Sequence, residues 1–195
     1  PLHLKAVIDP LMDAGFLIDV NGSEISIRPG LKRRPLKLDT LPYPSFPTDM
    51  QAQMCALLAT TEGISVVTEN VFPHRFMHVA ELKRMGADID LQGATLVIKG
   101  VPQLSGAPVM ASDLRASACL VLAALAAEGE TTISRVYHLD RGYSGMERVL
   151  ASLGADIERC KETKAEPAED AVPAMLPSIR GAGLTSRAAQ EPLAK

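Results

Sequence analysis

The 195-residue sequence has no tryptophan, only three cysteines, and aromatic residues at 4% of its length. Three cysteines are too few for a disulfide framework, and such a count is typical of a protein in a reducing, cytoplasmic compartment. The scarcity of aromatic side chains argues against a surface on which single-stranded nucleic acid stacks. No run of 18 apolar residues is present, and Lys5 and Asp9 interrupt the first residues. The sequence therefore predicts neither a membrane-spanning helix nor a secretory signal.

The charge balance is mildly acidic, because 20 Lys and Arg stand against 23 Asp and Glu for a net charge of −3. Hydrophobic residues make up 47% of the chain and charged residues 22%, which is ordinary for a globular protein. The length suffices for one large or two small domains with a buried core. We therefore expect a globular protein that binds neither nucleic acid nor a membrane surface.

Two segments differ in composition from the rest of the chain. Residues 29–46 contain four prolines, and a fifth follows at Pro47. Proline fixes φ and removes a backbone donor, so this segment is expected to be an extended connector. Residues 162–195 are rich in Ala and Pro and contain no aromatic residue, and we expect them to form a disordered tail.

The residues between these segments repeat. Phe16–Arg28 and Ala87–Lys99 each alternate apolar and polar residues around a central Gly, a pattern typical of a β-hairpin. Each follows a helix-like stretch that ends in Gly, a residue that stops helices through its left-handed conformation. A third such stretch ends at Gly154, and Ala155–Arg159 after it is expected to form only the first strand of another hairpin.

A second element also recurs. Pro47–Gly63 and Ala111–Gly129 each place Thr or Ser, then Asp, before a long apolar helix, and a short β-rich run follows each helix. Thr48 is expected to form a capping box with Gln51, and Ser112 to cap the second helix. Together the elements predict a strand–helix–strand–helix–strand–strand unit of about 65 to 71 residues, a length typical of a repeated βαβ-type module.

These repeats divide the chain into five parts. The parts are the second half of a truncated repeat unit at 1–28, a connector at 29–46, a repeat unit at 47–110, an incomplete unit at 111–161 and the tail at 162–195. Because the first unit begins in its middle and the sequence starts at Pro1 without Met, we expect this chain to be part of a larger fold.

In each full repeat, the Asp at the helix start is followed by an Arg near the start of the next helix: Asp49 by Arg75, and Asp113 by Arg141. A helix N-terminus holds a carboxylate ionised, and a carboxylate can accept a proton from a substrate hydroxyl. Arginine presents a planar fork suited to phosphate or carboxylate. The same residues also suit a purely structural pairing, and their spacing does not decide between the two roles.

Other reactive residue types give weaker indications. Cys55 and Cys119 lie on alanine-rich helices and are expected to be small buried hydrophobes, not nucleophiles. His74 and His78 are four residues apart, as zinc ligands on a helix are, but no third ligand accompanies them, and we predict no metal site. The sequence has neither a GxxxxGK[ST] phosphate loop nor a GxSxG elbow, so nucleotide hydrolysis and serine hydrolase chemistry have no support.

Four motifs resemble the family of UDP-N-acetylglucosamine 1-carboxyvinyltransferases, which are enolpyruvyl transferases. They are PSFPTDMQAQ at 44–53, ENVFPHRFMHVAELKRMGAD at 69–88, MASDLRASACLVLAALAAEG at 110–129 and YHLDRGYSGMERVLASLGADIER at 137–159. The resemblance runs from the start of the chain to about Lys161 and corresponds to the C-terminal part of the family's chain.

The resemblance implies an α/β fold: the inside-out α/β barrel of enolpyruvyl transferases, built from repeated βαβαββ units and here truncated. It also implies transfer of the enolpyruvyl group from phosphoenolpyruvate to the 3′-hydroxyl of UDP-N-acetylglucosamine, with release of phosphate and without a metal or organic cofactor. That reaction is the first committed step of peptidoglycan synthesis, and so serves cell wall biogenesis, cell shape and cell division. The enzyme implied is cytoplasmic, and a monomer when complete.

The resemblance also assigns roles to individual residues. Asp49 matches the aspartate that contacts the 3′-hydroxyl and is the favoured general base. The backbone of Val71 matches a contact to the UDP-sugar, and Arg141 matches an arginine on the phosphoenolpyruvate side. Further polar residues that match the lining of the closed cleft are Arg75, Asp113 and Arg115. The catalytic candidates are Asp49, Asp113 and Arg141.

The N-terminal domain of the family has no counterpart here, and with it the mobile loop whose Cys or Asp acts as general acid is missing. None of the three cysteines matches that loop position. We therefore expect the chain to be inactive alone and to need the missing N-terminal domain as its partner. The alternatives are a relative of 5-enolpyruvylshikimate-3-phosphate synthase, and a non-catalytic remnant or interaction module.

Overall fold

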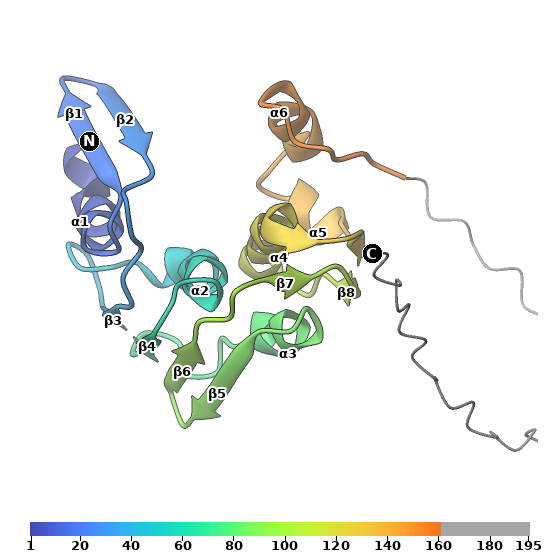
Figure 1. The fold of residues 1–195 in the computed structure, drawn as a ribbon, viewed down its shortest axis with the longest axis horizontal. Helices are drawn as coiled ribbons and strands as arrows, with labels where there is room; N and C mark the ends of the chain where they lie inside the picture. The colour runs from blue at the N-terminus through green and yellow to red at the C-terminus, as the bar shows by residue number, and fades with distance from the viewer. Residues whose placement is uncertain (161–195) are drawn as a thin grey trace, which may run out of the picture. The chain divides into compact units, whose positions relative to one another are not determined.

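Residues 37–99 fold into a four-stranded sheet with two helices, in the order strand–helix–strand–helix–strand–strand that the repeat predicted (Figure 1). The elements are β3 (Lys37–Thr40), the 3-10 turn η2 (Thr48–Met50), α2 (Gln51–Ala59), β4 (Ile64–Glu69), α3 (Met77–Arg84), β5 (Asp88–Gln92) and β6 (Thr95–Lys99). Strand β3 pairs in parallel with β4, and β6 lies between β4 and β5, antiparallel to both. This is one complete βαβαββ unit.

Strand β3 lies inside residues 29–46, the segment predicted to be an extended connector. Leu38 and Thr40 are buried while their neighbours Lys37 and Asp39 are exposed, because one face of the strand packs on the core. The strand is short and follows a proline-rich stretch, so its alternation gave little signal in the sequence. In the structure this part of the connector is the first strand of the unit.

The two predicted hairpins are confirmed. One is formed by β1 (Leu17–Asn21) and β2 (Glu24–Arg28), the other by β5 and β6, and in both the central Gly has a positive φ, 61° and 63°. Before the first hairpin come the 3-10 turn η1 (Leu2–Leu4) and α1 (Lys5–Asp13), which ends before Gly15 as predicted.

A second, partial unit follows the four-stranded sheet. Its elements are β7 (Leu104–Ser105), β8 (Pro108–Met110), α4 (Leu114–Ala126), β9 (Ala127–Glu128), β10 (Thr132–Ser134), α5 (Tyr137–Asp140) and α6 (Met146–Ser152). Strand β8 pairs in parallel with β10, as β3 does with β4, and β7 pairs with β9. The expected strand at Ala155–Arg159 does not form, because no partner strand lies beside it in the described residues.

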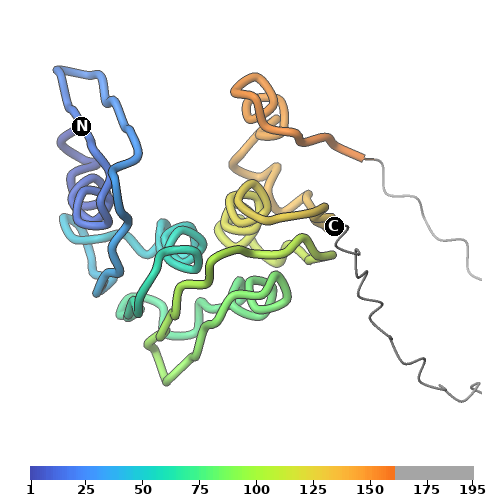
Figure 2. The backbone as a smooth tube through the Cα atoms, in the orientation of Figure 1, coloured from blue at the N-terminus to red at the C-terminus, as the bar shows by residue number. Residues whose placement is uncertain are grey.

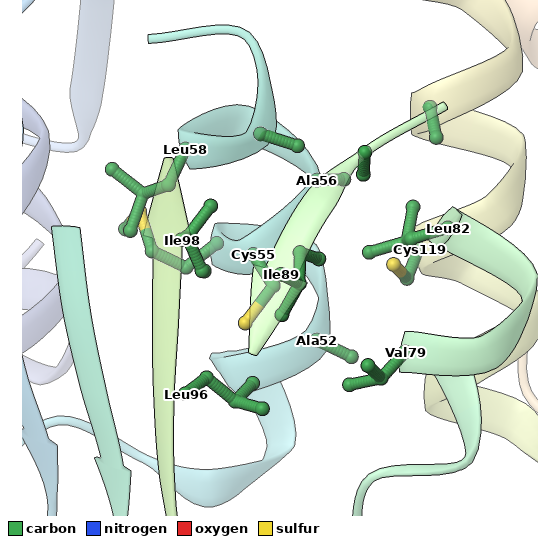
Figure 3. Packing of buried hydrophobic residues seen from close by; sticks show 14 of the residues in the cluster. Ala52, Cys55, Ala56, Leu58, Val79, Leu82, Ile89, Leu96, Ile98 and Cys119 are labelled. Atoms are coloured by element: carbon green, nitrogen blue, oxygen red, sulfur yellow. The ribbon is translucent and has the colours of Figure 1, made fainter. Parts of the chain in front are cut away.

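The core lies between the sheet and helices α2 and α4. These two helices run side by side, and α3 packs against α4 (Figure 2). Figure 3 shows Cys55 and Leu58 of α2 among Leu96 and Ile98 of β6, with Cys119 of α4 close to α3. Both thiols are fully buried, and burial raises their pKa, so they are the small hydrophobes that the sequence predicted and not nucleophiles.

The computed structural model describes residues 1–160, which form one unit. The tail predicted at 162–195 lies outside them. The strands of the described residues do not close into a barrel, which agrees with the truncated enolpyruvyl transferase fold that we expected. None of the described helices combines the length and the apolar character needed to span a membrane.

Candidate active site

Asp49 forms ion pairs with two arginines from different units. Its Oδ1 atom accepts hydrogen bonds from Nε of Arg115 at 2.6 Å and from Nη1 of Arg75 at 3.1 Å. The hydrogen bond from Arg115 lowers the pKa of Asp49 below its ordinary value, and the charge of Arg75 lowers it further. Asp49 is therefore ionised at neutral pH. Its carboxylate binds Arg75, which lies 26 positions after it in the sequence, and Arg115, which lies 66 positions after it.

Arg75 is fixed by three neighbours. Besides Asp49, its Nη1 atom donates to Oγ1 of Thr48 at 3.0 Å, and its guanidinium carbon lies 4.0 Å from the centre of the Phe72 ring. A cation over an aromatic face is attracted to it, and the planar guanidinium suits this stacking. The residue precedes α3, which begins only at Met77, so Arg75 lies in the turn before that helix.

Asp113 caps α4. Its Oδ1 atom accepts from the backbone N–H groups of Arg115 at 2.9 Å and Ala116 at 3.0 Å. The prediction that Ser112 caps this helix was wrong by one residue, because the extended backbone of Asp113 places its carboxylate over the free N–H groups. Through the backbone of Arg115, Asp113 also holds the arginine that pairs with Asp49.

The predicted capping box at the start of α2 does not form either. Thr48 is the first residue of the turn η2, which precedes the first residue of α2, Gln51, and no side chain caps this helix. The hydroxyl of Thr48 instead donates to Oε2 of Glu69 at 2.8 Å. Thr48 is therefore part of the site and not a helix cap.

An open cavity of about 430 Å³ lies beside this network. Residues from the turn before α3 and from the start of α4 line it: Phe72, Pro73, His74, Arg75, Asp113 and Arg115. Two guanidinium groups border one hollow, beside a 13-residue helix whose first N–H groups already donate to Asp113. The paired guanidinium groups favour a ligand with phosphate or carboxylate groups.

Arg141 is not part of this hydrogen-bonded network and is not among the residues that line the cavity. It is exposed in the turn that follows α5, and the structure gives its side chain no ion pair or hydrogen bond within residues 1–160. The prediction that it stands at a helix start was wrong, because α5 is a short helix that ends before it. The backbone N–H of Val71 donates to Oε1 of Glu69 at 2.9 Å, so this N–H already has a partner within the described residues.

The two histidines do not share a helix face. His74 is exposed at the cavity and precedes α3, whereas His78 is within α3 and only 1% exposed. Among the residues that the structure describes, no group of three or more His, Cys, Asp and Glu is placed to hold a metal ion.

Glu69 was not among the sequence candidates, although it contacts the turns that carry Thr48 and Val71. It ends β4, where Ser65, Val67 and Glu69 alternate with less buried residues. This alternation is one of burial and not of residue type, because the less buried face carries Ile64, Val66 and Thr68, so no sequence pattern marks Glu69 as buried.

The capping role of Asp113 gives a testable expectation. Asp113→Ala should lower the free energy of unfolding of the chain by about 1 kcal/mol, because two N–H groups of α4 lose their acceptor. Urea denaturation measures this, and Asp113→Ser, which keeps a capping oxygen, should recover most of the loss. Equal stability of the alanine and serine variants would contradict the capping role.

The architecture and the site define a class. The strand and helix order is that of enolpyruvyl transferases: the enolpyruvyl transferase NikO from Streptomyces tendae is 35% identical with a TM-score of 0.72, over 78% of this chain and 36% of that one. The EPSP synthase from Acinetobacter baumannii, at 22% identity and a TM-score of 0.58, shares the fold. Residues 1–150 match the EPSP synthase (3-phosphoshikimate 1-carboxyvinyltransferase) family, and the chain belongs to this family.

Within the family, the chain is similar in sequence to UDP-N-acetylglucosamine 1-carboxyvinyltransferases. That of Desulfosudis oleivorans is 56% identical over 159 residues, and that of Myxococcus xanthus is 55% identical over 161 residues. These matches cover 82% and 83% of this chain but only 38% of each relative. The chain thus corresponds to part of these enzymes.

Proposed function

We propose that the chain is the part of a UDP-N-acetylglucosamine 1-carboxyvinyltransferase that carries the base and arginines of its site, and that it needs the rest of the enzyme for activity. The observation that carries this proposal is the ionised carboxylate of Asp49, held by Arg115 and Arg75 beside the cavity that both arginines line. The identity of 56% to a relative of that name supports the choice of substrates, and the 38% coverage supports a missing part.

In the proposed reaction, Asp49 accepts the proton of the sugar 3′-hydroxyl as its oxygen bonds to C2 of phosphoenolpyruvate. A general acid from outside this chain protonates C3, which gives a tetrahedral intermediate. Loss of a proton from C3 and of phosphate from C2 then gives the enolpyruvyl ether. Arg75 and Arg115 would balance the anionic groups of the substrates, and exposed Arg141 would face phosphoenolpyruvate.

The pairing of Asp49 with two arginines makes it a weak base in the free chain. A substrate phosphate or carboxylate that engages Arg115 would take the strongest hydrogen bond away from Asp49. The pKa of Asp49 would then rise, and its carboxylate would become more basic when substrate is bound. Asp113 would act by holding the backbone of Arg115 in place.

The remaining expectations about biological context form part of the same proposal. An enzyme of this kind would catalyse the first committed step of peptidoglycan synthesis, on which cell division depends. We place it in the cytoplasm, where a reducing environment suits its three free cysteines. The shikimate-pathway alternative is less favoured, because an EPSP synthase structure is only 22% identical.

The test is phosphate release from phosphoenolpyruvate and UDP-N-acetylglucosamine. We expect none from the chain alone, and release once the remaining part of the Desulfosudis oleivorans relative is added as a separate polypeptide. Shikimate 3-phosphate in place of the UDP-sugar should give no release. Activity of the chain alone would contradict its dependence on a second part. A folded chain that stays silent in both assays would instead support the non-catalytic remnant or interaction module.

A further inference from the structure

The carboxylate of Glu69 is fully buried at the end of β4. In the parallel pairing of β3 with β4, Thr40 lies directly beside it. Both strands end here, and the chain continues from β4 into the turn that leads to the cavity. The backbone therefore brings a buried acid to within one turn of the candidate active site.

Four donors surround the two oxygens of Glu69. Oε1 accepts from Oγ1 of Thr40 at 2.7 Å and from the backbone N–H groups of Val71 and Phe72, both at 2.9 Å. Oε2 accepts from Oγ1 of Thr48 at 2.8 Å. Val71 and Phe72 belong to the turn that leads into the cavity lining, and Thr48 belongs to the turn that carries Asp49, so one carboxylate connects both turns.

No arginine or lysine of the described residues pairs with Glu69, so hydrogen-bond donors alone compensate its charge. Burial raises the pKa of Glu69. The hydrogen bonds from the Phe72 amide, the hydroxyls of Thr40 and Thr48 and the Val71 amide outweigh this effect and hold the pKa below its ordinary value. The group is therefore an ionised, buried acceptor, a costly arrangement unless every donor around it is fixed.

The hydroxyl of Thr48 connects Glu69 to Arg75. A threonine hydroxyl has one proton, and here Glu69 accepts it. The oxygen of Thr48 must then present its lone pairs elsewhere, and Nη1 of Arg75 donates to it at 3.0 Å. The same Nη1 atom bonds Oδ1 of Asp49 at 3.1 Å.

We propose that Glu69 is a positioning residue of the transferase site, which orients the hydroxyl of Thr48 and thereby fixes Arg75 against Asp49. This inference rests on the proposed function, because it assigns Glu69 to the same reaction. Glu69 touches no substrate in this scheme. It acts only through Thr48 and Arg75.

Two substitutions interrupt the relay at different points. In Glu69→Gln the side-chain NH2 group faces Thr48 and forces its hydroxyl to turn its proton towards Arg75. In Thr48→Val the hydroxyl is lost and Glu69 is unchanged, whereas Thr48→Ser keeps the hydroxyl. Glu81→Gln is the matched control, because Glu81 is another shielded glutamate that accepts a backbone N–H, that of Met110, outside the site.

The first measurement uses the chain alone and does not depend on activity. In NMR spectra, exchange of the Arg75 guanidinium hydrogens with water should become about tenfold faster in Glu69→Gln and in Thr48→Val, because Arg75 loses an oriented acceptor. Thr48→Ser and Glu81→Gln should match the original protein. Unchanged exchange in both interrupting variants would overturn the proposal. If Glu69→Gln does not fold, unchanged exchange in Thr48→Val still overturns the proposal, because Glu69 acts on Arg75 only through Thr48.

The second measurement uses the reconstituted transferase. Glu69→Gln and Thr48→Val should lower kcat by about tenfold, with the KM for the UDP-sugar little changed, because a misplaced base affects the chemical step. Thr48→Ser should restore kcat. If Arg75 exchange is faster in Glu69→Gln and Thr48→Val but kcat is unchanged, the proposal that Glu69 contributes to catalysis is overturned. If the original mixture releases no phosphate, the proposed function fails, and the Arg75 exchange still decides whether Glu69 positions Arg75.

Discussion

Asp49→Ala is expected to lower kcat of the reconstituted transferase by about 10²- to 10⁴-fold, the range typical of a lost general base. Asp49 is the carboxylate that the structure places against two arginines beside the cavity. Without it, no group at that position accepts the proton of the attacking hydroxyl. Initial rates of phosphate release at saturating substrates measure the effect.

The same substitution should leave the free energy of unfolding of the chain almost unchanged. The side chain of Asp49 is 60% exposed, and ion pairs at this exposure contribute at most about 1 kcal/mol. A large loss of rate with little loss of stability separates a chemical role from a structural one. Thermal unfolding of the chain alone supplies the second quantity.

The control for Asp49 is Asp88→Ala, which removes an exposed carboxylate from β5, away from the cavity. It should change neither rate nor stability. A rate for Asp49→Ala equal to that of the control would rule out Asp49 as the base. A low rate accompanied by unfolding would show that its pairing with the arginines is structural.

The second large effect concerns His78, whose burial should make the chain less stable in mild acid. Its side chain is only 1% exposed, and burial lowers its pKa from 6.5 to about 4, against the opposing charge of Asp113. In the unfolded chain the same imidazole titrates near its ordinary value. Folding therefore excludes a proton that the unfolded chain binds readily.

The difference in the pKa of His78 between the folded and unfolded states sets how the free energy of unfolding changes with pH. Above pH 6.5 both states hold a neutral imidazole and His78 adds no pH dependence. As the pH falls from 6.5 to about 4, only the unfolded state gains the proton, so the free energy of unfolding falls by about 3 kcal/mol in total. Below that range both states are protonated and the loss stops growing.

Urea denaturation of the chain at pH 7 and pH 4.5 tests this expectation. Comparison with His78→Leu isolates the histidine, since the carboxylates of the chain titrate in both proteins. As the pH falls from 7 to 4.5, the free energy of unfolding of the original chain should decrease more than that of His78→Leu. His74→Gln is the matched control, because it removes an exposed histidine. Parallel pH profiles for the original chain and His78→Leu would show that His78 is not the titrating group.

Some of the site follows directly from sequence pattern, and some does not. The repeat pattern predicted Asp49, Arg75 and Asp113, the family resemblance added Arg115, and the structure brings the four together. Arg141 was predicted with them, but in the described residues it neither bonds to them nor lines the cavity. The sequence gives the spacing of such residues along the chain, but not which turns meet across units.

The helix starts show how local patterns mislead. Ser112 and Thr48 both have the residue type of a cap, and neither caps a helix. In one case the next residue reaches the free N–H groups, and in the other a distant carboxylate, that of Glu69, takes the hydroxyl proton. Capping preferences are worth about 1 kcal/mol, so a buried acceptor outweighs them easily.

By itself the sequence determined the repeated unit, both hairpins and the glycines that end helices, because these depend on periods of two and 3.6 residues and on local backbone freedom. Only the tertiary structure decided which of the two hairpins is buried: Ile89 and Ile98 pack on α2 and lie in the core, while Leu17 and Ile27 stay exposed. It also decided that Arg115 of one unit reaches Asp49 of another. Burial and long-range pairing depend on which surfaces meet, and alternation along a single strand carries no information about that.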